Sequence, residues 1–344
     1  MKRILLIKLT SLGDLIHALP ALTDARGFYP DIEIDWLIDE NFQEIASWHP
    51  AIHRIFTTNH REWRHGLTKP QTLSSIYSLI KKLRSTQYDL IVDGQGNFKT
   101  GLFTLCMKGI RCGFDRHSVR EPIAHLAYQK KVSSSKKSHA INRLRELFAG
   151  ALDYPIPKDP PECGILEDRF RPPSCSLPAS YLVFVHNASW QTKLWPESHW
   201  IKLIKMAVDR GYKILLPWGN PEEEARAKRL AIDPQVQVLP KLALSEVGYV
   251  LKRALACVSM DTGLSHLIAA LNIPSLTLYG ATDSGLIGAS GKNQLYLRTT
   301  LACAPCNKKK CKLEPTSNTP PCLAQITPEL VFNKLLQLLP KNPS

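Results

Sequence analysis

The stretch Ser259-Met260-Asp261-Thr262-Gly263-Leu264-Ser265-His266-Leu267-Ile268-Ala269-Ala270-Leu271 decides the fold of this chain. The apolar run 254–258 before the polar turn predicts a buried strand, and the apolar run 267–271 after it predicts a packed helix. Open α/β sheets bind ligands where the carboxyl end of a strand meets the amino end of a helix. The free N–H groups and the positive dipole end of such a helix favour a phosphate.

The residues of this turn fit a ligand site, and they also fit an ordinary helix start. Gly263 lets a ligand approach the backbone closely, while Asp261, Thr262 and His266 offer hydrogen bonds. An Asp N-cap followed by a Thr-Gly turn explains the same residues without any ligand. The segment alone leaves both interpretations open.

Strand and helix patterns alternate on both sides of this segment. Strands are expected at 3–9, 33–38, 88–93, 181–185, 212–216, 236–239, 254–258 and 275–279. Helices are expected at 15–26, 100–107, 123–128, 141–152, 197–210, 221–231 and 328–339. This alternation predicts the α/β class with doubly wound parallel sheets.

Two domains are expected from the length of the chain and from a linker. The 344 residues suffice for two hydrophobic cores, and seven prolines between 154 and 178 mark the linker. We predict one Rossmann-like domain at 1–165 and a second at 178–325. Two such domains that face each other leave a cleft in which a substrate can bind.

The composition argues against a membrane-spanning or secreted chain. Hydrophobic residues make up 44% and charged residues 22%, which is typical of a soluble globular protein. No run reaches the roughly 18 apolar residues that a membrane span needs. The apolar run 4–7 is too short for a signal-peptide core, so a cytosolic location is expected.

A net charge of +14 favours partners that carry many negative charges. Phosphorylated substrates, anionic lipid and nucleic acid all qualify, although a surface with excess lysine explains many of the charges. No helix-turn-helix, zinc-finger or aromatic-rich RNA-binding signature accompanies the basic residues. Nucleic acid is therefore not expected as a partner.

Four of the nine cysteines, Cys303, Cys306, Cys311 and Cys322, are close together in the sequence. Four thiols at this spacing are able to hold a structural zinc ion. The spacing lacks the paired C-x2-C knuckles of common zinc ribbons. A loop of free cytosolic thiols is the favoured interpretation, and no other metal site is predicted.

Four loops at predicted strand ends carry the remaining chemistry. Three of them, 186–193, 217–224 and 261–266, fall in the second domain and together predict a pocket for a nucleotide diphosphate. In the first domain, Asp14 follows the first strand. A carboxylate there is ordinarily a helix-dipole residue, and it would be a general base if it faced the substrate.

The sequence lacks the motifs of several other enzyme classes. It contains no G-x-x-x-x-G-K-[ST] or G-x-G-x-x-G loop, and no G-x-S-x-G elbow or H-E-x-x-H helix. Interpretations as a kinase, dehydrogenase, hydrolase or zinc protease lose support accordingly.

A set of motifs along nearly the whole chain matches one family. In the first half these are 7–14, 17–24, 35–36, 47–49, 93–96 and 120–122, and in the second half 193–200, 216–219, 226–230, 261–266 and 279–288. The chain resembles the bacterial lipopolysaccharide heptosyltransferases of glycosyltransferase family nine, most closely the heptosyltransferase I group. In combination the motifs are far more specific than any one of them alone.

The resemblance implies a GT-B fold with the acceptor site in the first domain and the donor site in the second. It implies an inverting transfer of heptose from ADP-L-glycero-β-D-manno-heptose to Kdo of Kdo2-lipid A, without cofactor or metal. The enzyme would act at the cytoplasmic face of the inner membrane, as a peripheral protein held by electrostatic attraction to the inner leaflet. The segment 326–344 would form a C-terminal helix that packs back on the first domain.

The resemblance also implies residue roles. Asp14 would be the catalytic base. The donor would be bound by Ala188, Ser189, Lys193, Glu223, Leu242, Asp261, Thr262, Gly263 and His266, with only the backbone of Ala188 contributing. The acceptor would be bound by Lys8, Ser11, Arg61, Arg64, Arg120 and Arg143.

Two other functions stay open at this point. The cysteine-rich tail departs from heptosyltransferase I and is similar to the other heptosyltransferases, so the chain could add a later heptose or use another nucleotide-sugar. A non-catalytic protein that binds anionic surfaces would also explain the net charge.

Overall fold

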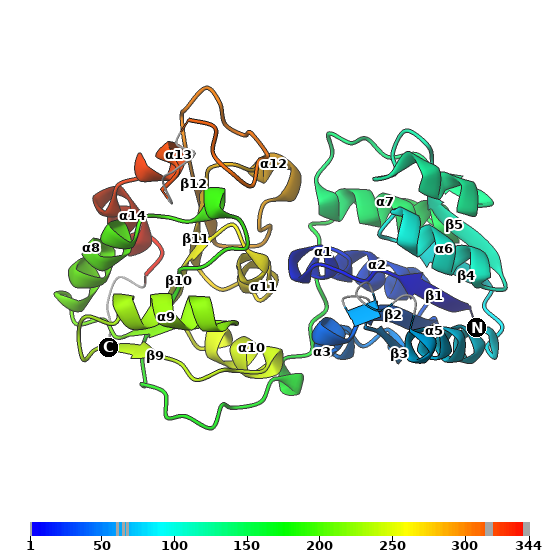
Figure 1. Ribbon diagram of the computed structural model, residues 1–344, viewed down its shortest axis with the longest axis horizontal. Helices are drawn as coiled ribbons and strands as arrows, with labels where there is room; N and C mark the ends of the chain where they lie inside the picture. Colours follow the sequence, from blue (N-terminus) through cyan, green and yellow to red (C-terminus); the bar gives the residue numbers. More distant parts are fainter. Residues whose placement is uncertain (1, 60–61, 64–65, 67–68, 314–318, 340–344) are drawn as a thin grey trace. The chain divides into compact units, whose positions relative to one another are not determined.

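The chain divides into two compact units, Met1–Leu166 and Glu167–Ser344, each built around a six-stranded sheet (Figure 1). The computed structural model describes residues 2–59, 62–63, 66, 69–313 and 319–339. The division falls inside the proline-rich stretch 154–178. Among the described residues, no helix is long and apolar enough to cross a membrane.

The first sheet is parallel throughout and has the order β3-β2-β1-β4-β5-β6. Its strands are β1 (Arg3–Ile7), β2 (Glu33–Asp39), β3 (Ile52–Thr58), β4 (Leu90–Asp93), β5 (Ile110–Phe114) and β6 (Lys130–Val132). The strand order reverses between β1 and β4. The topological switch point, where such sheets bind ligands, therefore lies between the loops that follow these two strands.

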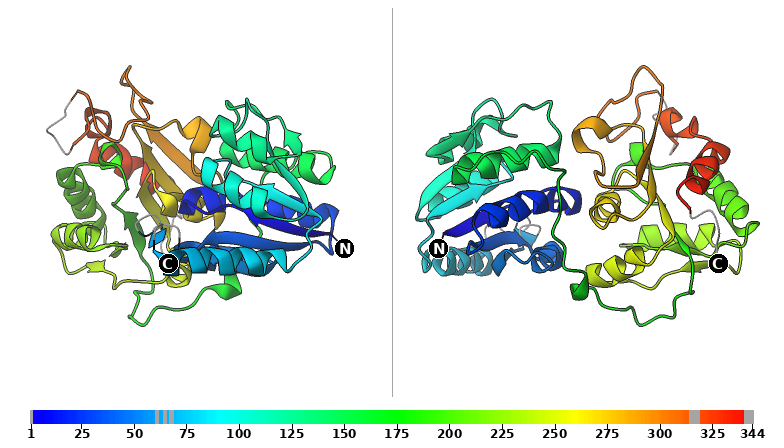
Figure 2. Two further views of the ribbon diagram at one scale, coloured as in Figure 1. Left: turned by 45° about the vertical axis from the view of Figure 1, so that its right-hand side comes forward. Right: turned by 180° about the vertical axis from the view of Figure 1, so that it is seen from behind.

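Helices cover both faces of this sheet (Figure 2). They are α1 (Leu12–Ile16), α2 (Leu19–Phe28), α3 (Gln43–Ser47), α5 (Pro70–Arg84), α6 (Phe98–Cys106) and α7 (Ala140–Leu152), with 3-10 turns η1 (Glu40–Phe42) and η2 (Pro122–Ala127). Right-handed crossovers place α5, α6 and η2 on one face and α2 and α3 on the other, where α7 joins them. The contacts of α6 with η2 and of α2 with α7 agree with this arrangement.

The core of the first unit is apolar on one face and includes a buried ion pair on the other. Leu5, Ile7 and Ile91 of the sheet pack against Leu83 of α5 and Met107 beyond α6. On the opposite face, Arg145 of α7 binds the Asp24 carboxylate of α2 through Nε (2.6 Å) and Nη2 (3.2 Å). Both side chains are nearly buried, so this pair ties the two helices in one register.

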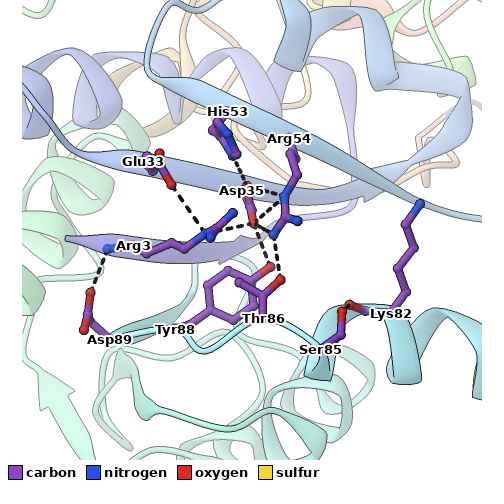
Figure 3. A network of polar contacts seen from close by, with 10 residues as sticks. All are labelled: Arg3, Glu33, Asp35, His53, Arg54, Lys82, Ser85, Thr86, Tyr88 and Asp89. Carbon is purple, nitrogen blue, oxygen red and sulfur yellow. Dashed lines mark hydrogen bonds and ion pairs between the residues drawn. The ribbon is translucent and has the colours of Figure 1, made fainter. Parts of the chain in front are cut away.

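Asp35 of β2 is the centre of a polar network near the amino ends of the strands (Figure 3). Its carboxylate is fully buried and accepts hydrogen bonds from Arg54 Nη2 (2.6 Å) and from the Tyr88 hydroxyl (2.8 Å). His53 Nδ1 lies 3.2 Å away. Burial raises the pKa of Asp35, but the bonds from Arg54, Tyr88 and His53 outweigh it and hold the pKa below its ordinary value.

The second sheet repeats the same topology, with the order β12-β11-β10-β7-β8-β9, and is also parallel. Its strands are β7 (Leu182–Val185), β8 (Ile214–Leu216), β9 (Val236–Val238), β10 (Ala256–Met260), β11 (Ser275–Tyr279) and β12 (Gln294–Arg298). The order reverses between β7 and β10. The loops that begin at His186 and Asp261 therefore flank the second switch point.

The helices of the second unit include the C-terminal one. They are α8 (Glu197–Val208), α9 (Pro221–Leu230), α10 (Leu244–Lys252), α11 (Gly263–Ala270), α12 (Ser284–Ile287), α13 (Pro321–Ala324) and α14 (Pro328–Leu336), with 3-10 turns η3 (Glu167–Arg169) and η4 (Gln191–Lys193). The sequence predicted that the last helix packs back on the first domain. In the structure, α14 packs against α8 and β11 of its own unit, and a contact with the first domain stays a prediction.

Several predicted elements differ from the observed ones for identifiable reasons. The single helix predicted at 15–26 is two helices, because Pro20 lies in the first turn of α2 and cannot continue α1. The strand predicted at 254–258 runs from Ala256 to Met260, so Thr262, and not Asp261, is the N-cap of α11. The helix predicted at 123–128 is the 3-10 turn η2.

Some elements had no counterpart in the prediction. These are β3, β5, β6, β12, α3, α5, α10, α12 and α13. The outer strands β6 and β12 are only partly buried and lack a continuous apolar run, and α5 buries one residue fully. Neighbouring elements, and not local periodicity, specify them.

We predict that Asp35→Asn lowers the free energy of unfolding at pH 7 by about 2–4 kcal/mol, because a buried charged acceptor is lost. Since the folded pKa of Asp35 lies below the unfolded value of about 3.9, this stabilisation is present above that value. It disappears as the pH falls through the folded pKa. Urea unfolding at a series of pH values measures the difference.

Glu33→Gln is the matched control, since Glu33 forms a looser pair with Arg3 (3.5 Å) at the same end of the sheet. We expect a change below about 1 kcal/mol. A wild-type minus Asp35→Asn difference that is independent of pH down to pH 2 would contradict the prediction.

Candidate active site

In the first unit, the loop after β1 holds Asp14 in a defined position. Asp14 is in the first turn of α1, and its Oδ2 accepts hydrogen bonds from the backbone N–H and the hydroxyl of Ser11, both at 3.0 Å. The carboxylate is partly buried at the carboxyl edge of the sheet. It therefore has the fixed orientation that a general base needs.

Lys8 joins the two loops of this switch point. Its side chain is only 5% exposed, and Nζ donates to the carbonyl of Gly94 after β4 at 2.9 Å. Gln95 strengthens the connection, because its Oε1 accepts from the backbone N–H of Leu9 (3.1 Å) and of Thr10 (3.3 Å). The β1 loop and the β4 loop thus form one rigid assembly.

The charges of this assembly keep Asp14 ionised. Burial raises the pKa of Asp14, but the positive charge of Lys8 and the hydrogen bonds from Ser11 lower it by more. The pKa of Asp14 therefore lies below its ordinary value. Burial also lowers the pKa of Lys8, which Asp14 and Asp93 partly offset. At neutral pH the Asp14 side chain is therefore a carboxylate.

Asp93 supports the β4 loop. The sequence indicated this residue only as part of the motif 93–96. Its Oδ1 accepts from the N–H groups of Gln95 and Gly96 (both 2.9 Å), and Tyr128 donates to Oδ2 at 2.6 Å. Gly96 has φ +67°, a conformation that favours glycine. Asp93 is fully buried, and its place at the end of a strand was the available signal for this role.

The basic residues predicted for the acceptor are only partly placed. Arg120 follows β5, and its charge contributes to the lowered pKa of Asp14. Arg143 lies in the first turn of α7, where its guanidinium donates to the Ser118 carbonyl and lies 4.8 Å from the centre of the Phe114 ring. Lys8 and Ser11 are adjacent to Asp14. Arg61 and Arg64 lie outside the described residues.

The second unit contains a cavity of about 610 Å³ at the carboxyl ends of β7 and β8. Three predicted donor residues, Ala188, Ser189 and Glu223, line it. The other lining residues are Asn187, Gln191, Leu194, Trp195, Pro196, Glu197, Asn220, Glu222, Arg226, Arg229 and Thr319. The predicted loops 186–193 and 217–224 therefore meet in one pocket, whereas no residue of 261–266 lines it.

An ion pair joins the loops after β7 and β10 at the second switch point. Lys193 Nζ lies 2.6 Å from Asp261 Oδ2, and the two side chains are 13% and 4% exposed. The Thr282 hydroxyl, from the loop after β11, donates to the same oxygen. Sequence reasoning selected Lys193 and Asp261 separately, while Thr282 was quoted only within a motif.

The remaining predicted donor residues also lie at strand ends. Glu223 is in the first turn of α9, where its Oε2 accepts from the Gly219 N–H at 2.8 Å. Leu242 is partly buried in the loop between β9 and α10. Thr262 and Gly263 begin α11, and His266 is 7% exposed one turn later. The free amides of this helix start face the same edge of the sheet as the ion pair.

The clustered cysteines do not form a metal site in the part of the chain that the structure describes. Cys303 is exposed, Cys306 and Cys311 are partly exposed, and Cys322 is buried at the start of α13. No three of the described His, Cys, Asp or Glu side chains are arranged to hold one ion. Burial raises the pKa of the Cys322 thiol to about 11, and the charges of Cys306, Cys311 and Cys303 raise it as well.

Two parallel sheets of this order, each with polar loops at its switch point, define a GT-B-type glycosyltransferase fold. The family model of glycosyltransferase family 9 (heptosyltransferase) matches residues 76–317. The chain belongs to this family of glycosyltransferases, as the motifs of the sequence predicted.

Curated relatives agree over nearly the full length. The chain is 40% identical to lipopolysaccharide heptosyltransferase 1 of Pseudomonas aeruginosa, with 98% of each sequence covered. It is 43% identical to lipopolysaccharide heptosyltransferase 1 of Escherichia coli K12 over 86% of this chain and 93% of the relative.

Solved structures show the same similarity. The E. coli heptosyltransferase WaaC with ADP superposes with a TM-score of 0.86 at 39% identity and covers 98% of this chain and 99% of that chain. WaaC with ADP-2-deoxy-2-fluoro heptose gives 0.83 at 37% identity, with 97% and 99% covered. E. coli heptosyltransferase II, at 22% identity and a TM-score of 0.76, shares the fold.

We predict that Lys8→Met raises the pKa of Asp14, because the change removes the positive charge that lowers this pKa most while keeping the length of the side chain. Titration of the Asp14 side-chain carboxyl by NMR measures this pKa directly. Lys131→Met, an exposed position on β6, is the control and should leave the pKa unchanged. Equal Asp14 titration in Lys8→Met and wild type would show that Lys8 does not set the charge of this carboxylate.

Proposed function

We propose that this glycosyltransferase moves L-glycero-D-manno-heptose from ADP-heptose to Kdo of Kdo2-lipid A, with inversion at the anomeric carbon. The observations that carry the proposal are the Lys193–Asp261 pair at the second switch point and the cavity at the carboxyl ends of β7 and β8. The identity of 40–43% to heptosyltransferases 1 supports the donor and the acceptor. The reaction belongs to lipopolysaccharide inner-core synthesis, at the cytoplasmic face of the inner membrane.

The second unit is proposed to bind the donor. The similar WaaC structure contains ADP-2-deoxy-2-fluoro heptose, which supports the same class of ligand here. Ser189 and the Ala188 backbone would contact the phosphates, Glu223 the ribose, and Leu242 the adenine. Asp261 and His266 would contact the heptose or its phosphates.

The leaving group is proposed to be stabilised by Lys193 and by the amides at the start of α11. As the glycosidic bond breaks, ADP gains negative charge. Hydrogen-bond donors that are already in position lower the energy of that charged state. Lys193 keeps further N–H donors available while one of them binds Asp261. The ion pair thus orients the ammonium before the donor arrives.

Asp14 is proposed to remove the proton from the acceptor hydroxyl. The anomeric carbon has oxocarbenium character in the transition state, so the hydroxyl becomes acidic late and a weak base suffices. Lys8, Ser11, Arg61, Arg64, Arg120 and Arg143 are proposed to bind the carboxylates and phosphates of the acceptor. Arginine in particular forms paired hydrogen bonds with such groups.

We predict that Asp14→Ala lowers transfer by about 10²–10⁴-fold while ADP binding is retained, because the base acts only in the chemical step. The assay combines purified protein, ADP-heptose and truncated Kdo-lipid A and detects product by mass spectrometry. Asp31→Ala, an exposed acid of the same unit, is the control. Normal transfer by Asp14→Ala would refute the mechanism, and a wild type without transfer would refute the function.

We predict that Lys193→Ala weakens ADP binding at least tenfold, which corresponds to about 1.4 kcal/mol. Calorimetry measures the affinity, and Lys205→Ala, an exposed position on α8, serves as the control. Thermal stabilisation by ADP-heptose should exceed that by UDP- or GDP-sugars. Preference for a UDP-sugar would instead support the alternative donor. Equal ADP affinity in Lys193→Ala and wild type would show that Lys193 does not bind the phosphates.

A further inference from the structure

One helix of the first unit exposes an apolar stripe. Phe98, Leu102 and Leu105 of α6 are 49%, 48% and 51% exposed. Their spacing of four and three residues places them on one side of the helix. The opposite side of α6 is used for the core, since Thr100, Gly101 and Thr104 are buried. The stripe is therefore an additional apolar surface and not an incompletely buried core face.

Two neighbouring elements carry similar stripes. Leu73 and Tyr77, four residues apart on α5, are 55% and 69% exposed. Ile123 and Leu126, three residues apart on the 3-10 turn η2, are 55% and 69% exposed. Three residues make one turn of a 3-10 helix, so this pair also points to one side.

The three stripes lie on elements that cover the same face of the first sheet (Figures 1 and 2). Both α5, through Leu83, and the end of α6, through Met107, pack against Leu5 and Ile7. The turn η2 contacts α6 directly. Exposed apolar groups gathered in this way are uncommon on a protein surface and mark a site of interaction.

The charge around these stripes is strongly positive. On α5, Lys81, Lys82 and Arg84 are all exposed, and neither α5 nor α6 contains an Asp or Glu residue. Lys99 follows Phe98 on α6, and Lys108 lies just beyond the end of that helix, both exposed. Asp93 is buried, and Glu121 Oε2 accepts from the Phe98 N–H. The partner of this face therefore carries negative charge.

We propose that the face formed by α5, α6 and η2 docks on an anionic lipid bilayer. Apolar side chains that enter the interface and lysines that meet anionic headgroups are the two attractions that hold peripheral proteins on membranes. A tyrosine such as Tyr77 suits the headgroup level. The inference rests on the proposed function in one respect: a lipid-linked acceptor explains why such a face is useful.

The test is sedimentation of the full chain with vesicles of phosphatidylglycerol and phosphatidylethanolamine, compared with phosphatidylcholine alone. Wild type binds the anionic vesicles, and salt weakens the binding. Leu102→Asp/Leu105→Asp lowers the affinity at least tenfold, whereas Ile232→Asp, at an exposed apolar position of the second unit, leaves it unchanged. Thermal stabilisation by ADP shows that each variant is folded.

Further experiments distinguish lipid headgroups from free phosphate as the ligand, and the membrane-docking proposal from the proposed function. Lys99→Gln/Lys108→Gln lowers the affinity and its salt dependence, while inorganic phosphate at equal ionic strength does not compete. Leu102→Asp/Leu105→Asp keeps the wild-type transfer rate on a deacylated, water-soluble Kdo acceptor. Three results would contradict the membrane-docking proposal: wild type stays in the supernatant with anionic vesicles, phosphate competes, or Leu102→Asp/Leu105→Asp binds normally. Absence of sugar transfer alone would contradict only the proposed function.

Discussion

In each unit, a lysine side chain spans the point at which the strand order reverses, and the candidate site depends on these two contacts. Lys193 reaches Asp261 across the gap between β7 and β10, and Lys8 reaches the Gly94 carbonyl across the gap between β1 and β4. Parallel strands leave a crevice at such a point because their connections depart to opposite faces. A long cationic side chain fills the crevice and fixes the loops on both sides of it.

The two lysines differ in their partners, and the proposed roles of the units follow from this difference. Lys193 has a carboxylate partner of low exposure, so its charge is oriented and still available to an incoming anion. Lys8 is bound to a carbonyl and influences the carboxylate of Asp14 through space. One lysine is thus proposed to bind the leaving group, and the other to keep the base ionised.

Much of the architecture was accessible from the sequence, because apolar runs ended by polar turns mark parallel strands. The strand 275–279 and the helix at 221–231 were predicted within one residue. Local patterns could not show that Thr282 joins Lys193 on Asp261, since three separate strand ends meet there. They also missed α5 and β6, whose side chains are largely polar or partly exposed, and the break at Pro20. The site residues were selected mainly through the family motifs.

The Asp35 network stands at the amino ends of the strands, whereas every proposed site residue in the described part of the first unit stands at or beyond the carboxyl ends. The groups that anchor this unit and those that are proposed to act on substrate are therefore separate sets of residues. Loops at one edge can accumulate substitutions during evolution without loosening the polar anchor at the other. This division of labour gives one scaffold the freedom to acquire new acceptor preferences while it keeps its resistance to unfolding.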